Sequence, residues 1–311
     1  LDENTAKRMR FTEITEHSLK NSMRHLGVLD KNLRDSQKAR AILDFVFGFK
    51  LSPFISNELG TYGLSAGRVQ TPILYKIFER DNEMKQENLI KKNDIFLVTG
   101  ENHKFHLKNE NTEIDICKMK KKSGTIIEKK SKLESNKSLP PYKTSTLLAD
   151  VCKRMNLNSK LIMNTLQKLY EQGKITYHRT DSINISASFK KEIVKYIINV
   201  YGNNYTKSRI LKENGKAQCA HECIRVTDIE KMYKDNSIES RIYNLIRMRT
   251  LASQMTDEKY EKNEYVLLYE DLHWINIQKK VIFKGFRIIY PDSEKQEILF
   301  DKHQKIQTIY N

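Results

Sequence analysis

The sequence has few cysteines, prolines and glycines and lacks long apolar runs. Its 311 residues include 4 Cys, 5 Pro, 11 Gly and a single Trp. No Cys-x-x-Cys pair is repeated, so neither a disulfide framework nor a zinc ribbon is indicated, and we expect a reducing compartment inside the cell. No apolar run approaches the ~20 residues that cross a bilayer, and we expect no membrane partner.

Two further absences concern metal binding and the start of the chain. Cys219, His221 and Cys223 lie close together, but a structural zinc site needs a fourth ligand and this spacing is unusual, so we expect no metal bound by this chain. The first residues contain neither an initiating Met nor a signal pattern. We therefore expect a piece of a longer polypeptide.

Positive charge is abundant. Lys and Arg number 55 against 39 Asp and Glu, for a formal charge of +16 and a pI near 9.4. Such an excess favours a polyanionic partner through counterion release, with nucleic acid first and a membrane surface second. The cations are spread over globular segments and form no single amphipathic stripe, which disfavours the membrane surface. Charge alone leaves open that the lysines only solvate the surface.

The pattern of apolar residues predicts an α+β protein of two to three domains. Residues 1–88 are predicted to be helical, with one helix over 36–47 ended by Gly48 and Pro53 and another over 67–88. Short β-rich runs follow at 95–98, 104–107 and 114–116. Seven lysines between 118 and 132 indicate an exposed hairpin or connector.

A second helical region follows the β-rich one. We expect a helix from Thr144 to Arg154, capped by the hydroxyls at its start, and a second over 159–172 that closes at Gly173. Residues 175–177 are β-like, which gives the helix-turn-helix-strand order of a winged-helix module. Helices at 186–200 and 240–255 and strands at 265–269, 274–277, 281–283 and 287–290 complete the pattern, so the β region lies on both sides of a helical insert.

Tyr177 and Arg179 are the candidate catalytic pair. Residues two apart in a strand point the same way, so the phenol and the guanidinium share a face. A fixed cation stabilises a phenolate, whose parent phenol has a pKa near ~10, and the charge that grows on a phosphate under attack. A tyrosine in a strand is more often a packing residue, so the pair alone does not identify the chemistry.

The surrounding motif is more specific. Residues 175–182, I-T-Y-H-R-T-D-S, closely resemble the active-site signature of type IA DNA topoisomerases, I-T-Y-M-R-T-D-S, with His178 in place of Met. Four further segments resemble the same family in the same order: 63–72 (G-L-S-A-G-R-V-Q-T-P), 141–147 (P-Y-K-T-S-T-L), 220–225 (A-H-E-C-I-R) and 251–255 (L-A-S-Q-M). Weaker similarity extends it to 10–15, 35–40 and 285–286, and so to nearly the whole chain.

The resemblance implies a toroidal core made of four parts. These are the N-terminal part of a helical base or gate domain (1–88), the first part of a β arch (89–138), a winged-helix-like domain with the active-site tyrosine (139–255) and the returning part of the arch (256–311). It also implies that Tyr177 cuts one DNA strand, becomes linked to its 5′ end, and allows strand passage and religation without ATP. Arg179 would hold the tyrosine and the scissile phosphate.

The resemblance also assigns DNA contacts. His221 would donate to phosphate oxygens, and Arg68 and Gln70, at a helix start after Gly67, would bind the single strand leading to the cut. Apart from the resemblance, Tyr75 follows Arg68 by seven residues, roughly on the same helix face, and our hypothesis is that it stacks a base. Further candidate contacts are Thr144, Ser145, Thr180, Asp181 and Arg225; for the hydroxyls, helix capping is an equal alternative.

Family features absent from the sequence limit what it is expected to do. It contains no D-x-D motif, so the Mg²⁺ of the full enzyme is expected in a Toprim domain elsewhere, on the same polypeptide or a partner chain. The gate motif G-I-G-R-P-S-T is absent too, and we expect no relaxation or religation by this chain alone. The expected substrate is single-stranded or negatively supercoiled DNA, with RNA left open, in the cytoplasm, nucleoid or nucleus. The alternative is a non-catalytic module that binds single-stranded nucleic acid on the same scaffold.

Overall fold

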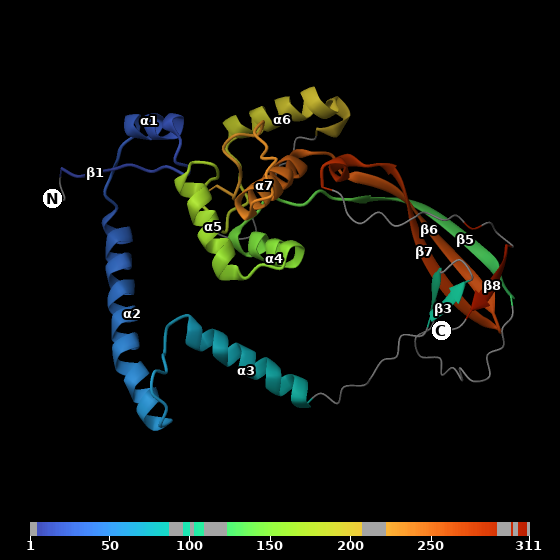
Figure 1. Cartoon of the computed structure of the whole chain (residues 1–311), viewed down its shortest axis with the longest axis horizontal. Coiled ribbons are helices and arrows are strands. Elements are labelled where there is room, and N and C mark those ends of the chain that lie inside the picture. Colours follow the sequence, from blue (N-terminus) through green and yellow to red (C-terminus); the bar gives the residue numbers. More distant parts are fainter. Residues whose placement is uncertain are drawn as a thin grey trace. The chain divides into compact units, whose positions relative to one another are not determined.

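The computed structural model describes residues 5–86, 96–99, 103–108, 123–206, 222–290, 300 and 304–309 (Figure 1). The predicted strand at 114–116 and the predicted contact His221 lie outside these residues. The chain divides into two compact units. Unit 1 comprises Leu1–Arg10 and Arg24–Asn93, and unit 2 comprises Phe11–Met23 and Asp94–Asn311.

Unit 1 consists of two helices and a small strand pair. The strands are β1 (Lys7–Arg8) and β2 (Gly27–Val28), and the helices are α2 (Lys31–Glu58) and α3 (Gln70–Gln86). The side chain of Asp30 caps α2 by accepting from the backbone N–H of Leu33 at 3.0 Å.

The prediction that the first helix ends at Gly48 and Pro53 is wrong, because α2 runs on to Glu58 with Pro53 inside it. Proline removes one helical hydrogen bond, at a cost of roughly 3 kcal/mol. Hydroxyls on both sides of it tie the last turns to the loop that follows. The Ser52 hydroxyl accepts from Ala66 N–H at 3.0 Å, and the Ser56 hydroxyl donates to the Leu64 carbonyl at 3.3 Å.

Four helices of unit 2 pack into the larger of its two cores: α4 (Thr144–Met155), α5 (Ser159–Glu171), α6 (Ala187–Tyr201) and α7 (Ile238–Gln254). Helix α7 is buried on most of its faces, whereas the others are amphipathic. Helix α5 begins at its cap, Asn158, and ends before Gly173, whose φ is +68°. These helices confirm the predicted ones to within two residues.

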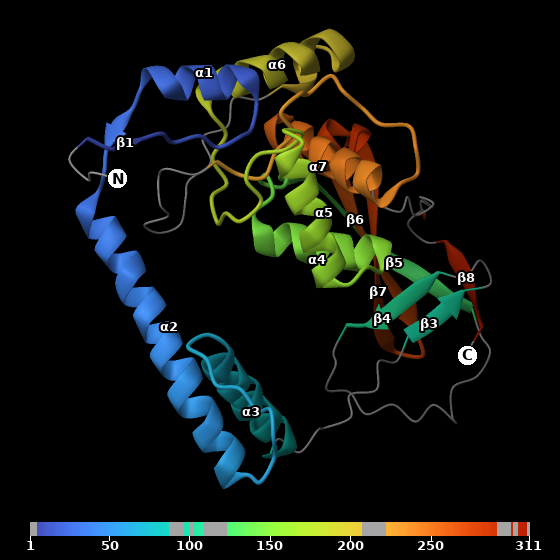
Figure 2. The same ribbon diagram turned by 60° about the vertical axis from the view of Figure 1, so that its left-hand side comes forward.

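The second core lies in an antiparallel sheet that closes on itself in the order β3-β4-β7-β6-β5-β8. Its strands are β3 (Phe96–Thr99), β4 (Lys104–Leu107), β5 (Ser123–Asn136), β6 (Glu258–Tyr269), β7 (Leu272–Phe283) and β8 (Lys305–Ile309). The long strands β5, β6 and β7 lie side by side between the helical core and the closed end, in both Figure 1 and Figure 2.

Three predicted strand runs at 265–283 belong to one hairpin. Strands β6 and β7 are joined by Glu270 and Asp271, whose φ values of +46° and +59° suit a tight two-residue hairpin turn. The part of the lysine-rich segment that is described, from Ser123 onward, is strand and not a connector, because it pairs with β6 along its length.

The predicted strand at 287–290 is wrong. Gly285–Ile288 forms a 3₁₀ helix, η3, in which Gly285 has a φ of +48°. Phe286 donates its N–H to the Thr256 carbonyl at 3.0 Å and buries its ring in the helical core. The apolar residues at 286–290 therefore reflect a turn that packs into the core and not a strand. The α+β class of the whole protein is as predicted. Among the described residues, no helix combines the length and the apolarity that crossing a bilayer requires.

Candidate functional site

The segment that carries Tyr177 is extended and tied down on two sides. It enters through an antiparallel bridge between Ile175 and Val226. Thr176 N–H donates to the Arg225 carbonyl at 2.9 Å, and Tyr177 N–H donates to the Thr12 carbonyl at 2.9 Å. Because both neighbours lie far away in the sequence, the position of Tyr177 is set by tertiary structure.

Burial alternates along this segment with the period of an extended chain. His178 and Thr180 are buried, whereas Tyr177 is half-buried and Arg179 and Asp181 are exposed. Tyr177 and Arg179 are thus both more exposed than His178 and Thr180, although the strand on which the predicted shared face depended is limited to the bridge at Ile175. Within the described part of the chain, Arg179 has no ion-pair partner, so its charge is available to an anion.

Thr144 clamps the same segment from the start of α4. Its hydroxyl donates to the His178 carbonyl at 2.7 Å and accepts from Thr180 N–H at 2.9 Å, while its own N–H donates to the Thr180 carbonyl at 3.0 Å. The Thr144 hydroxyl is therefore used in holding the backbone. Ser145 beside it is exposed and lies in the first turn of α4, and the N-terminal end of a helix favours an anion.

The hydroxyl of Thr180 is also engaged, since it accepts from Ser182 N–H at 3.1 Å. Helix α4 begins at Thr144 as predicted, but the predicted capping by a hydroxyl that accepts from first-turn N–H groups is wrong. Lys143 is the cap residue, and the Thr146 hydroxyl accepts from its N–H at 3.1 Å.

His178 is buried and its ring contacts that of Tyr177. Its ring is fully buried, and neither ring nitrogen has a hydrogen-bond partner among the described residues. The rings of Tyr170 and Tyr177 lie edge-on, with centroids 5.1 Å apart, and the His178 centroid is 5.4 Å from that of Tyr177. Burial, and then the charge of Arg179, hold the pKa of His178 below its usual value. The imidazole therefore packs as a neutral ring.

Arg225 is buried and paired with carboxylates. Its Nη2 lies 2.6 Å from an oxygen of Glu222, and its Nη1 lies 3.0 Å from Glu13 while donating to the Val226 carbonyl at 3.1 Å. Its guanidinium carbon lies 3.9 Å from the ring centroid of Phe189. In this structure the guanidinium is thus committed to the protein, and its predicted contact with DNA stays a prediction.

Arg68 and Gln70 belong to unit 1. Arg68 Nε donates to Asp44 at 2.8 Å, and this pair is about half exposed. The Gln70 amide donates to the Ser65 hydroxyl at 3.1 Å. Tyr75 is exposed on α3. The structure keeps these side chains at the surface, so their predicted contacts with a single strand stay predictions.

Sequence reasoning missed Thr12, Glu13 and Glu222 as neighbours of the tyrosine segment. Thr12 and Glu13 lie in the weakly similar segment 10–15 and Glu222 lies in the 220–225 motif, but neither resemblance indicated these contacts. Burial raises the pKa of the Cys223 thiol to about 12, so it is protonated at neutral pH. Among the described residues, no three His, Cys, Asp or Glu side chains are grouped so that they could hold a metal ion.

Comparison with known proteins gives the same assignment over most of the chain. The family model described as DNA topoisomerase matches residues 28–309. DNA topoisomerase 1 type prokaryotic of Acanthamoeba polyphaga mimivirus is 33% identical over 92% of the chain and 39% of its own length. DNA topoisomerase 1 of Aquifex aeolicus is 32% identical over 94% of the chain and 57% of its own length.

A reverse gyrase and a solved structure extend the comparison. Reverse gyrase 2 of Aquifex aeolicus is 33% identical over 98% of the chain and 27% of its own length. The structure of full-length topoisomerase I from Thermotoga maritima superposes with a TM-score of 0.81 at 26% identity, over 96% of this chain and 53% of that one. The chain thus spans between a quarter and three fifths of these relatives.

Proposed function

The chain belongs to the type IA DNA topoisomerase family, and on this premise we propose that it carries the strand-cutting tyrosine of such an enzyme. Tyr177 is the nucleophile, single-stranded or negatively supercoiled DNA is the substrate, and the protein acts where DNA lies within the cell. The observation that carries the proposal is the proximity in one clamped segment of the half-buried Tyr177 and the exposed Arg179, whose guanidinium has no ion-pair partner among the described residues.

The proposed reaction exchanges one phosphodiester for another. The phenolic oxygen of Tyr177 attacks a backbone phosphorus, forming a bond to the 5′ phosphate, and the bond to the 3′ oxygen breaks. The proton lost by the phenol is balanced by the proton that the 3′ hydroxyl gains. Bond energy is conserved, so the reverse attack religates the strand and no ATP is consumed.

Arg179 and the start of α4 supply the electrostatics of this step. The guanidinium stabilises the phenolate and the charge on the phosphate oxygens, and the N–H groups near Ser145 favour the same charge. Asp181 lies on the same exposed side, where it contacts a nucleotide through donors on the base or sugar. Thr144 and Thr180 are positioning residues, because their hydroxyls hold the backbone on either side of Arg179.

The remaining predicted contacts are proposed to act away from the cut. Arg68 and Gln70 bind the strand leading to it, and His221 binds phosphate oxygens. Arg225 holds the 223–226 segment against Thr176 through the carboxylates of Glu13 and Glu222. The closed sheet and its long strands act as the arch that moves during strand passage.

We further propose that Mg²⁺ and proton transfer depend on a Toprim domain supplied by the longer polypeptide or by a partner. The described residues offer no cluster of ligands for the ion, so the roles assigned above involve only the side chains of this chain. Supercoil relaxation by this chain alone is not expected.

The decisive test is covalent trapping on a single-stranded oligonucleotide labelled at its 3′ end, with and without a supplied Toprim domain. The label should stay with the protein, because the tyrosine holds the 5′ phosphate of the downstream fragment. Tyr177→Phe should form no adduct. Tyr170→Phe is the matched control, since its ring packs against Tyr177, and it should keep the adduct.

Absence of an adduct from the unaltered protein under both conditions, with strand binding intact, would favour the non-catalytic binding module. An adduct that survives in Tyr177→Phe would assign the chemistry to another side chain.

A further inference from the structure

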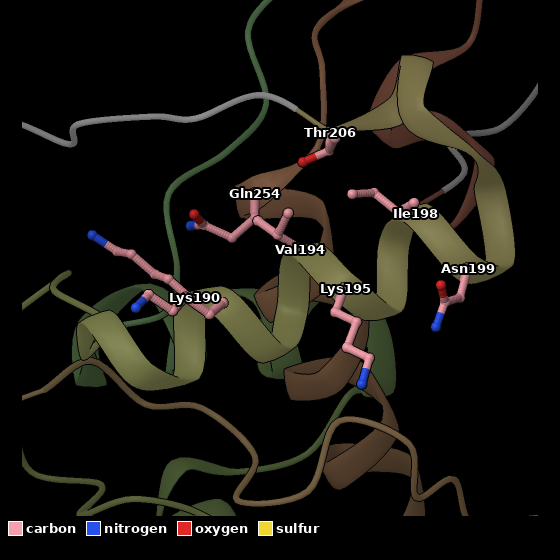
Figure 3. Close-up of a pocket in the computed structure, with 8 residues that line it drawn as sticks. Lys190, Val194, Lys195, Ile198, Asn199, Thr206 and Gln254 are labelled. Carbon is pink, nitrogen blue, oxygen red and sulfur yellow. The ribbon is translucent and has the colours of Figure 1, made fainter.

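Helix α6 borders a hollow of about 640 Å³ that the proposed chemistry does not use (Figure 3). Three lysines on α6 line it: Lys190, Lys191 and Lys195. None of them forms an ion pair with the described residues. By contrast, Lys20 and Lys76 pair with acidic residues one turn away on their own helices. The hollow therefore offers uncompensated positive charge.

The rest of the lining is apolar with a few hydrogen-bonding groups. Val194 and Ile198 lie one turn apart on α6 and expose aliphatic surface. Gln254, at the end of α7, also lines the hollow while 2% exposed, and its amide nitrogen donates to the Ser253 hydroxyl at 3.1 Å. Figure 3 shows the Gln254 amide on the side of the hollow where Lys190 lies. A ligand in this hollow would therefore contact cations, an apolar surface and an amide.

Helix α6 connects this hollow to the tyrosine segment. The N–H of Ser186, at the start of α6, donates to Glu222 at 2.6 Å, and Phe189 packs under the guanidinium of Arg225. The Arg225 carbonyl in turn accepts from Thr176, next to the nucleophile. From Phe189 to Lys195 the helix rises by only ~9 Å, at 1.5 Å per residue. The cations therefore begin at the residue after Phe189 and continue along α6 away from the Arg225 cluster.

We propose that this hollow binds the backbone and one base of a single-stranded nucleic acid at a distance from the cut, which extends the path of the strand along α6. The inference rests on the proposed function, because it takes the strand bound at Tyr177 as its ligand. The lysines bind consecutive phosphates, Val194 and Ile198 contact the face of a base, and Gln254 bonds to its edge.

The mixture of groups favours a polynucleotide over other anions. A free phosphate would satisfy the lysines and leave the aliphatic surface uncovered, whereas a nucleotide covers both. Proteins that bind single strands without sequence preference combine the same two elements, a cationic groove and surfaces on which bases lie.

The test is a titration of labelled single strands of about 4 and about 16 nucleotides, the range of site sizes for such grooves, at several salt concentrations. The test variant is Lys191→Gln/Lys195→Gln. The control is Lys259→Gln/Lys280→Gln, which removes the same charge from exposed positions on β6 and β7. Both variants leave every group assigned to catalysis unchanged.

For the longer strand, the test variant should reduce the slope of log K against log salt by about 1.4, because each lost phosphate contact removes about 0.7. The shorter strand and the control should be unaffected. Ile198→Ala should weaken binding of the longer strand with an unchanged salt slope, because it removes base contact and no charge.

If the unaltered protein binds both strands and the test variant keeps its slope, the hollow is not on the path and the proposed function stands. If the unaltered protein binds neither strand, the proposed function fails as well. Binding to vesicles of anionic phospholipid is measured with the same variants. If the test variant binds these vesicles more weakly but binds both strands normally, the hollow is a membrane contact and the inference is overturned.

Discussion

Arg225 and Glu13 lie 212 residues apart in the sequence (225 − 13), yet Nη1 of the arginine lies 3.0 Å from Oε2 of the glutamate. The pair is largely buried, with side-chain exposures of 5% and 16%. It links the short segment 11–23 to the segment that carries Tyr177. The same two segments are joined by a hydrogen bond from Tyr177 N–H to the Thr12 carbonyl. The position of Tyr177 therefore depends on a segment that precedes it by more than 150 residues (177 − 23 = 154).

Removal of the Arg225 side chain should destabilise unit 2 strongly. Arg225→Ala leaves Glu13 and Glu222 without their cation, and breaking a buried pair in this way costs about 3–5 kcal/mol. Urea unfolding measures the change. Arg154→Ala is the control, because its pair with Asp150 is more exposed, and it should cost less than half as much. Equal losses would contradict the structural role assigned to Arg225.

Substitution of Gly173 should displace the segment 11–23. A Cβ at this position would lie 2.3 Å from the Ile14 carbonyl oxygen, and φ is +68°. Gly173→Ala should therefore cost clearly more than the ~1 kcal/mol of backbone strain, and it should also reduce adduct formation. Gly202→Ala isolates the strain, because φ there is +95° and nothing lies within 4 Å of its Cβ. Similar losses of stability for both variants would remove the clash as the cause.

His178 should make the protein sensitive to mild acid. Its pKa is lowered by burial and by Arg179, with Glu171 opposing. The unfolded chain thus binds a proton more readily than the folded one, and stability falls as pH drops below the unfolded value near ~6.5. His178→Met should flatten urea stability between about pH 5 and 7, and His273→Gln, at an exposed site, should not. Parallel profiles for the unaltered protein and His178→Met would contradict this account.

Asp150 should stabilise the junction between α4 and the end of the long strands. Its carboxylate accepts from the hydroxyls of Tyr142 and Tyr290 and from Arg154 Nε at 2.7 Å. Burial raises the pKa of Asp150, but these bonds outweigh it and leave the pKa below its usual value. This stability is present above the unfolded pKa near ~3.9 and is lost as pH falls through the folded one.

Asp150→Ala should therefore cost about 2–4 kcal/mol at neutral pH, since it leaves two buried hydroxyls and a cation without their acceptor. Tyr290→Phe is the milder comparison and should cost about 1 kcal/mol, because it removes one hydrogen bond. Thermal and urea unfolding give both values. An Asp150→Ala loss no larger than that of Tyr290→Phe would mean that the carboxylate contributes little.

Local signals sufficed for elements whose ends are set by neighbouring residues. Helix α5 begins at Ser159 and ends within one residue of its predicted end before Gly173, and the strand at 104–107 has the predicted bounds. Prediction failed where distant contacts override local preference. Pro53 stays inside a helix that the following loop braces, and 287–290 turns into the core because Thr256 provides an acceptor.

The candidate site likewise has a part that could be predicted from the sequence and a part that could not. The motif around Tyr177 and Arg179 is contiguous, so its resemblance to a family could be read directly from the chain. The partners of Arg225 and the lysine-lined hollow combine residues far apart in sequence, and no spacing rule reports such neighbours.

The amino-acid sequence by itself determined the family, the α+β class and the basic charge, and it singled out Tyr177 and Arg179 as the candidate reactive pair, because composition and short motifs are properties of adjacent residues. Tertiary structure alone decided that His178 is a buried neutral ring, that Arg225 is engaged by Glu13 and that α6 borders a cationic hollow. Burial and charge pairing depend on which distant segments come into contact, and these contacts form only in the folded chain.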